Sequence, residues 1–214
     1  MTRRNLLVGA SLIAIVAAFA GVEALQHPAT AQSIAQAELL VPPGLGDRSL
    51  GKDDAAVTIV EYASMTCPHC AHFHETTYPE LKKRYIDTGK VRFIFREFPL
   101  DSLAAGAAML ARCADKSKFF PLIETLFQQQ RTWAVEPPIP PLLAIAKQAG
   151  FSEKSFDACL SDQKMLEAIQ NEQKRAADKF GVNSTPTLFV NGKMQKGGTS
   201  IEELAKIIDP LLKS

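Results

Sequence analysis

The residues best able to do chemistry in this chain are two cysteines three positions apart, within Cys67-Pro68-His69-Cys70. A run of β-branched and apolar residues, 57–62, ends just before them and predicts a buried strand. Pro68 suits the first turn of a helix, because its φ is already helical and the N–H that it lacks would be unpaired there. One helical turn then separates the cysteines by a rise of about 4.5 Å, within the Cα separation of a disulfide. The pair is therefore predicted to open and close without backbone movement.

The expected position of Cys67, at the start of that helix, favours its thiolate. Unpaired backbone N–H groups and the positive end of the helix dipole should lower the pKa of this thiol below that of a free cysteine. A stabilised thiolate is a good leaving group and favours the dithiol form, so the disulfide form becomes oxidising. His69 can add a positive charge or a hydrogen-bond donor. Cys70, one turn inside, is predicted to be buried and to resolve mixed disulfides.

The same residues allow a metal-binding interpretation, because C-x-x-C is also zinc-ligand spacing and His69, His72 and His74 lie close by. A structural zinc site normally takes its second pair of ligands from a distant segment, and the chain has no second C-x-x-C or histidine pair. His72 and His74 are therefore predicted to form a solvated helix face, and no metal site is expected. A metal-binding protein that uses this Cys/His cluster is kept as an alternative.

The first 31 residues have the pattern of an export signal. Arg3 and Arg4 are followed by an apolar run, Leu6 to Ala20, and by Ala29-Thr30-Ala31, after which cleavage is predicted. The pair of arginines weakly resembles a twin-arginine signal, so the Sec and twin-arginine routes both stay open. A retained membrane anchor is the alternative, because the apolar segment is near the shortest length that spans a bilayer.

Composition predicts one compact globular domain with a substantial core, since 46% of the 214 residues are hydrophobic and 22% are charged. A net charge of +1 gives no footprint for nucleic-acid binding. Export changes the meaning of the cysteines, because disulfides persist outside the cytosol. Cys113 and Cys159, on opposite sides of a proline-rich turn at 137–141, are therefore predicted to form a structural disulfide.

The rest of the chain alternates strand and helix patterns. A helix is predicted from Cys67 or Pro68 to about Asp87 with a kink at Pro79, and a second buried strand over 91–98. From 101 to 180 apolar residues recur at helical spacing, broken by Pro121 and by the prolines of 137–141, which predicts a helical insert. Strands 187–190 and 193–196 then flank an Asn-Gly turn, and a capping box at Ser200 starts a terminal helix.

This order of elements resembles the DsbA-like branch of the thioredoxin superfamily. The resemblance rests on strand, C-P-H-C, helix, strand, helical insert, and then Thr185-Pro186-Thr187 before a hairpin and a last helix, from about Leu45 to the C-terminus. It implies an α/β thioredoxin fold, a central mixed β-sheet flanked by helices, with the insert at about 101–180. The expected organisation is a signal peptide at 1–31, an N-terminal arm at 32–44 and a thioredoxin-like domain at 45–214.

The resemblance also assigns roles to three further residues. It implies that Pro186 is cis and that its loop faces the active-site disulfide. Thr185 is then expected to contact the nucleophile and the bound substrate. Glu61, six residues before Cys67, matches an acidic residue that lies under the buried cysteine and shuttles protons. The other interpretation of Glu61 is a strand-end carboxylate that is paired with a lysine or simply solvated.

The function that follows is an exported, periplasmic thiol:disulfide oxidoreductase. It would donate the Cys67–Cys70 disulfide to unfolded or reduced secreted proteins, and by resemblance a DsbB-like membrane quinone oxidoreductase would reoxidise it. No soluble cofactor is required, and a monomer is expected because the arm is too short for a dimerisation domain. The alternatives are a disulfide isomerase or reductase of the same superfamily, and a periplasmic copper- or zinc-binding protein.

Overall fold

A computed structural model of the chain describes residues 36–213. The predicted signal peptide at 1–31, the membrane anchor considered in its place and the first residues of the predicted arm lie outside this part of the chain. Between residues 36 and 213, no helix combines the length and the apolar character needed to cross a bilayer.

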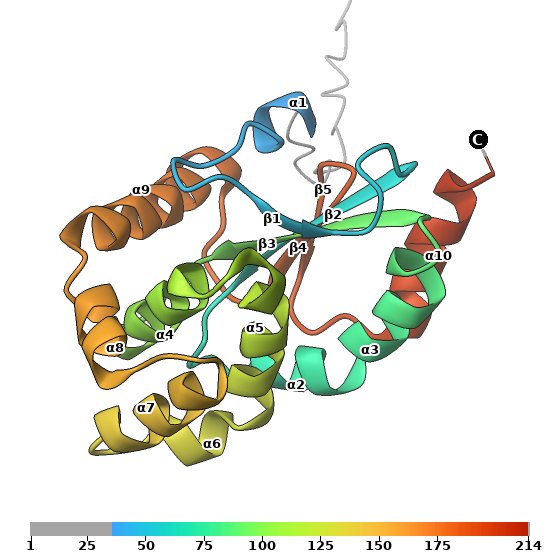
Figure 1. Cartoon of the computed structure of the whole chain (residues 1–214). Coiled ribbons are helices and arrows are strands. Elements are labelled where there is room, and N and C mark those ends of the chain that lie inside the picture. Colours follow the sequence, from blue (N-terminus) through green and yellow to red (C-terminus); the bar gives the residue numbers. More distant parts are fainter. Residues whose placement is uncertain (1–35, 214) are drawn as a thin grey trace, which may run out of the picture. The chain divides into compact units, whose positions relative to one another are not determined.

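Five strands form a mixed sheet at the centre of the described region (Figure 1). They are β1 (Arg48–Leu50), β2 (Val57–Ala63), β3 (Val91–Glu97), β4 (Thr187–Val190) and β5 (Lys193–Lys196), and their order across the sheet is β1-β3-β2-β4-β5. β2 runs parallel to β3, and the other pairings are antiparallel. The four longer strands match the predicted ranges to within one residue, whereas β1 was missed because three residues are too few to show alternation.

β2 is buried on both faces, so its alternating side chains enter two different layers. Val57, Ile59 and Ala63 belong to one apolar cluster, and Val60 and Tyr62 belong to the other. The period of two places Glu61 on the face of Ile59 and Ala63. A carboxylate is thereby held inside the larger core.

Helices cover both faces of the sheet (Figure 1). The larger core lies under α2 (Pro68–Thr76), α5 (Phe119–Gln128) and the terminal helix α10 (Ile201–Leu211). The smaller core lies under α1 (Gln36–Leu39) and α9 (Gln163–Phe180). The predicted capping box at Ser200 opens α10, whose apolar face is buried at Leu204 and Ile208.

The helix after the dithiol begins at Pro68, as predicted, but it is not continuous to Asp87. α2 ends before Thr77, and α3 (Tyr78–Leu81) and a π-helical turn (Lys82–Ile86) follow it. Pro79 explains the interruption, because proline cannot donate a backbone hydrogen bond and crowds the preceding turn. The predicted kink is therefore a junction between two helices.

Residues 101–180 form the predicted helical insert. Its prolines differ from the prediction, because Pro121 and Pro140 lie in the first turns of helices instead of breaking them. First-turn N–H groups have no partner within the helix, so a proline there loses no hydrogen bond. The helices are α4 (Ser102–Cys113), a 3₁₀ turn (Lys116–Lys118), α5, α6 (Gln130–Trp133), α7 (Ile139–Gln148), α8 (Glu153–Leu160) and α9.

A buried ionic network around Arg96 of β3 occupies the smaller core. The Arg96 side chain is fully buried, and its Nε and Nη2 donate to the two carboxylate oxygens of Asp47 at 2.8 and 3.1 Å. Its Nη1 donates to the Leu39 carbonyl and the Tyr62 hydroxyl. The Tyr62 hydroxyl in turn donates to Glu172 of α9 at 2.8 Å. The network therefore ties α1, the sheet and α9 together.

A disulfide joins Cys113, the last residue of α4, to Cys159 of α8, with their Cα atoms 6.2 Å apart. It connects two helices of the insert across 46 residues of sequence. Cys67 and Cys70 are free thiols.

Replacing both Cys113 and Cys159 by serine should lower the free energy of unfolding by at most about 4 kcal/mol, because the unfolded chain regains the entropy of a long closed loop. In a chain of this size the melting temperature should fall by up to about 8–16 °C. Thermal unfolding followed by circular dichroism measures the change. An unaltered melting temperature would show that this disulfide does not stabilise the fold.

Candidate active site

The active-site candidate begins where β2 delivers the chain to α2. Cys67 is the N-cap residue of α2, with φ −76° and ψ 119°, and Pro68 occupies the first helical position. Cys67 is 6% exposed and Cys70 is fully buried, whereas Pro68 and His69 between them are exposed. The nucleophile candidate therefore lies just under the surface, with the second thiol one turn deeper.

The surroundings of Cys67 stabilise its thiolate. A hydrogen bond from the Cys70 thiol is the largest effect, and it outweighs the opposing effect of burial. Thr185 and the backbone N–H groups of Cys70 and His69 lower the pKa further, to about 5 from an ordinary value of 9.0. The cause predicted from the sequence, the N–H groups at the start of the helix, is present, but the neighbouring thiol contributes more.

Cys70 is driven in the opposite direction. Burial raises the pKa of the Cys70 thiol well above 9.0, and the hydrogen bond to Cys67 and the charge of Glu61 raise it further. Two thiols on one helical turn thus differ strongly in acidity. Cys67 is the sulfur that can attack or leave as a thiolate, and Cys70 is the sulfur that holds a proton.

The loop before β4 lies against Cys67. The Thr185–Pro186 peptide bond is cis, and the Cys67 thiol donates a hydrogen bond to the Thr185 carbonyl at 3.3 Å. Pairing of β4 with β2 explains the approach, because Thr187 stands opposite Tyr62 near the end of β2. Thr185 and Pro186 are both buried. Segments more than a hundred residues apart in sequence therefore meet at the nucleophile candidate.

Glu61 and His74 form a buried pair beneath the dithiol. Glu61 is fully buried in β2, so it is not a solvated strand-end carboxylate. Its Oε2 lies 2.9 Å from Nε2 of His74, which is 4% exposed. The prediction that His72 and His74 share a solvated face is wrong for His74, because position 74 lies one turn after buried Cys70 and faces the sheet. His72 is exposed, as predicted.

The three histidines of the predicted Cys/His cluster lie in different environments, which weakens the metal-binding interpretation. His74 is inside the core and hydrogen-bonded to a carboxylate, while His69 and His72 are on the surface. Among residues 36–213, no group of three or more His, Cys, Asp and Glu side chains is arranged to hold a metal ion. The cluster that is dense in sequence is therefore divided in space.

Residues 45–210 match a protein-family model described as Thioredoxin. The chain belongs to the thioredoxin family. Its DsbA-like character and its thioredoxin fold are confirmed by alpha-DsbA1 of Wolbachia pipientis, a solved structure with a TM-score of 0.77 and 31% identity, over 84% of this chain and 96% of that one. Oxidised BdbD from Bacillus subtilis has a TM-score of 0.70 and 28% identity, over 81% and 97% of the two chains.

Sequence relatives carry names from the same group of enzymes. A "Putative protein-disulfide oxidoreductase" of Rickettsia felis is 38% identical over 168 residues, 78% of this chain and 60% of the relative. "Disulfide bond formation protein D" of Bacillus subtilis is 31% identical over 176 residues, 78% of each chain. The match thus spans about 60% of the length of the Rickettsia felis protein.

In this thioredoxin-family site, Gln130 was missed by sequence reasoning. It is a buried residue of α6, and its amide donates to the carbonyls of Met65 and Cys67 at 2.8 and 3.0 Å. These bonds fix the backbone on which the nucleophile candidate sits. No local pattern indicates such a role, because the contact depends on how the insert folds back over the sheet.

Asp101 also supports the segment before the dithiol. Its carboxylate accepts from Thr66 Oγ1 at 2.6 Å and caps α4 through the N–H of Ala104. An aspartate directly before a helical pattern is an N-cap signal that the sequence could have supplied. Asp101 thereby connects the start of the insert to the residue next to Cys67.

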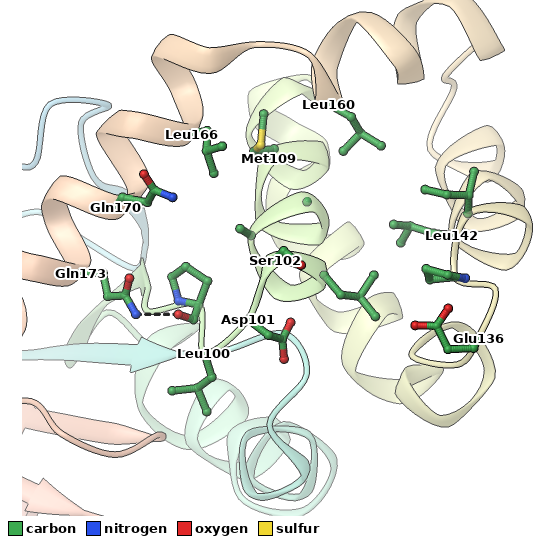
Figure 2. Close-up of a pocket in the computed structure, with 16 residues that line it drawn as sticks. Leu100, Asp101, Ser102, Met109, Glu136, Leu142, Leu160, Leu166, Gln170 and Gln173 are labelled. Atoms are coloured by element: carbon green, nitrogen blue, oxygen red, sulfur yellow. Dashed lines mark hydrogen bonds between the residues drawn. The ribbon is translucent and has the colours of Figure 1, made fainter.

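An apolar groove of about 640 Å³ opens next to this connection. Figure 2 shows its lining, which comes from α4 and the segment before it, from α7 and the segment before it, from the end of α8, and from α9. Leu100 and Ile139 contribute large exposed apolar side chains, 55% and 49% exposed. The ionisable groups in the lining are the carboxyl groups of Asp101 and Glu136. A mostly apolar groove with two carboxyl groups in its lining therefore includes Asp101, the partner of Thr66 in the Cys67 segment.

Proposed function

We propose that this chain is an exported thiol:disulfide oxidoreductase that donates the Cys67–Cys70 disulfide to unfolded, reduced secreted proteins. The observation that carries the proposal is the opposed acidity of the two thiols, a pKa of about 5 for Cys67 and a pKa raised well above 9.0 for Cys70. The names of the relatives in Rickettsia and Bacillus support the same reaction type.

The acidity of Cys67 favours disulfide donation over reduction. With a pKa of about 5, the Cys67 thiol is ionised at pH 7, about two pH units above its pKa. At about 1.4 kcal/mol per unit this favours the dithiol form by about 3 kcal/mol, which makes the couple more oxidising by about 60 mV. This stabilisation of the dithiol form is present above about pH 5 and grows until an ordinary thiol, with a pKa of 9.0, would also ionise. It is lost as the pH falls through about 5.

In the proposed reaction, a substrate thiolate attacks Sγ of Cys67 in the oxidised protein. The bond between Cys67 and Cys70 breaks, its electron pair goes to Cys70, and Cys70 takes up a proton. A second substrate thiolate then attacks the substrate sulfur of the mixed disulfide and releases Cys67 as a thiolate. The substrate loses two electrons and the enzyme gains them.

Five residues near the dithiol have a proposed part in this reaction. Pro68 starts the helix that supplies N–H groups, and His69 is placed at the surface where it can meet the substrate thiolate. Thr185 and Pro186 are proposed to bind the substrate backbone beside Cys67. Glu61 is proposed to exchange the proton with Cys70, because its charge reaches that thiol.

The groove of Figure 2 is a proposed docking surface for the reduced substrate chain. It is continuous with the Cys67 segment through the bond between Thr66 and Asp101, and unfolded chains expose the apolar side chains that its lining would cover. The carboxyl groups of Asp101 and Glu136 in the lining favour segments that also carry lysine or arginine. The proposed setting is the periplasm, with a monomeric enzyme, no soluble cofactor and a DsbB-like quinone oxidoreductase as reoxidant.

Mixing the oxidised protein with a reduced, unfolded protein that contains two cysteines tests the function. One disulfide should form in the substrate for each Cys67–Cys70 disulfide consumed, as counted by thiol titration and mass spectrometry. A substrate that stays reduced while the Cys67–Cys70 disulfide persists would contradict the proposal.

A further inference from the structure

We propose that His74 is a positioning residue for the proton of Cys70, and that it acts through its hydrogen bond to Glu61. The proposal rests on the function above, because only a redox cycle at Cys67 and Cys70 requires that proton to move. It is based on the carboxyl group of Glu61, which is fully buried in β2, and on the imidazole of His74, which points at it from α2.

The pair is isolated from solvent and close to Cys70. The side chains of His74 and Glu61 are 1% and 0% exposed, and Nε2 lies 2.9 Å from Oε2. His74 follows Cys70 by four residues on α2, so both side chains lie on the same face of the helix. The carboxylate of Glu61 also acts on Cys70, because its charge raises the pKa of that thiol. One carboxyl group thus links the histidine and the buried sulfur.

Aromatic packing fixes the orientation of the imidazole. Its ring stacks on Phe127 of α5, with centroids 4.3 Å apart and an interplanar angle of 24°. The ring centroids of Tyr78 and Phe95 lie 4.7 and 6.1 Å from the centroid of the His74 ring. A ring held in this way points Nε2 at Glu61 at little further entropic cost.

The contacts assign a role to each nitrogen of the His74 ring and to each carboxyl oxygen of Glu61. A carboxylate accepts, so Nε2 carries the hydrogen and donates to Oε2, which leaves Nδ1 as a bare acceptor. Within the described residues, Nδ1 of His74 and Oε1 of Glu61 have no hydrogen-bond partner. His74 therefore occupies one carboxylate oxygen and leaves the other available to the Cys70 proton.

The hydrogen bond between His74 and Glu61 is needed when Cys70 takes up its proton. As the substrate thiolate attacks Cys67, the electron pair of the broken disulfide reaches Cys70, and the proton moves from Oε1 of Glu61 to that sulfur. Glu61 becomes a carboxylate inside the core, where an unpaired charge is strongly disfavoured. The N–H of His74 stabilises this carboxylate, and reoxidation returns the proton along the same path.

Other titratable groups near the pair lie on α3 and α5. Burial, the charge of Glu124 on α5 and then the charge of Glu61 raise the pKa of Tyr78 on α3, so this phenol stays protonated near neutral pH. On the neighbouring strands, Phe95 and Leu188 stand beside Glu61 in register and carry no charge. The groups that face the pair are therefore Cys70 on α2, Tyr78 on α3 and Glu124 on α5.

His74→Phe and His74→Gln separate the hydrogen bond from the packing. Phenylalanine keeps a stacking ring and removes the donor, whereas glutamine removes the ring and can place an amide N–H near the position of Nε2. His72→Phe is the matched control, because it makes the same change on an exposed position of the same helix. The full chain of each variant, oxidised at Cys67 and Cys70, is mixed with a reduced dithiol peptide from pH 5 to 8 and quenched with acid.

His74→Phe should slow peptide oxidation by about 10- to 100-fold at pH 7 and change the pH profile, which is the range that one hydrogen bond to a charged group supplies. His74→Gln should recover most of the rate, and His72→Phe should match the wild type. In a Glu61→Gln background, His74→Phe should slow the reaction no further, because the partner is already lost. Alkylation of Cys67 should keep its wild-type pH dependence in every folded variant.

Equal rates for His74→Phe and the wild type across this pH range would overturn the role of His74 while leaving the proposed function intact. Additive losses in the Glu61→Gln background would also overturn it, since they would show that the ring only supports packing. A wild-type protein that does not oxidise the peptide at all would instead remove the proposed function, so the two failures are distinguishable.

Discussion

Cys67→Ser should abolish thiol–disulfide exchange with peptide dithiols, and Cys70→Ser should stop the cycle at a mixed disulfide. The difference follows from burial and acidity, because Cys67 is the near-surface thiol with the lowered pKa and Cys70 is the fully buried thiol with the raised one. A serine hydroxyl does not form the covalent bond to sulfur that the reaction needs. Each reduced variant is mixed with a disulfide-bonded peptide, so that Cys67 attacks one peptide sulfur and the other leaves as a thiolate. Gel electrophoresis without reductant then resolves the two outcomes.

Variants at position 70 also test how the reactivity of Cys67 depends on pH. In Cys70→Ser and in the reduced wild type, alkylation of Cys67 by iodoacetamide should increase as the pH rises, because the thiolate reacts and the thiol does not. In the wild type the midpoint should lie at about pH 5. In Cys70→Ala, which leaves no side-chain donor at position 70, the midpoint should lie higher, since the largest stabilising hydrogen bond is gone. Full oxidase turnover in Cys67→Ser would contradict the mechanism outright.

Arg96→Met should lower the free energy of unfolding by about 3–5 kcal/mol, the cost of leaving buried carboxylates without their cation. Asp47 loses both of its hydrogen bonds from Arg96, and Glu172 loses a guanidinium 3.5 Å away. The Leu39 carbonyl and the Tyr62 hydroxyl lose a donor as well. Urea unfolding measures the change, and the melting temperature should fall by about 6–20 °C.

Arg92→Met is the matched control for this loss. Arg92 lies on the same strand, but its side chain is 26% exposed and its partner Asp53 is 88% exposed. Such surface pairs contribute about 0–1 kcal/mol, so this variant should stay close to the wild type. Equal destabilisation by the two substitutions would show that the Arg96 network does not carry the stability assigned to it.

The main features of the site could be predicted because they are encoded locally. A β-branched run before Cys67, a proline at the first helical position and a cysteine one turn later are sufficient to place a dithiol at a helix N-terminus. The approach of Thr185 and Pro186 followed only from resemblance to a family, because no local pattern reveals which distant loop meets the motif. Burial of Glu61 had two interpretations until the flanking strands were in place.

The residues that escaped prediction act through tertiary contacts. His74 looked like a surface residue because histidines on a helix usually are, and the stack on Phe127 depends on α5 packing against α2. Gln130 reaches the dithiol backbone only because α6 folds over it. The break at Thr77 and the prolines in the first turns of α5 and α7 are local features. Whether a proline ends a helix or lies in its first turn depends on the neighbouring turns.

The redox equilibrium of Cys67–Cys70 with glutathione tests the central claim most directly. The reduced and oxidised fractions are trapped by acid at pH 7 over a range of glutathione ratios and counted by mass spectrometry. Stabilisation of the Cys67 thiolate predicts a potential several tens of millivolts more oxidising than that of thioredoxin, a couple that gives up its disulfide readily. A potential near that of thioredoxin, about −270 mV, would contradict disulfide donation and assign the protein to reduction.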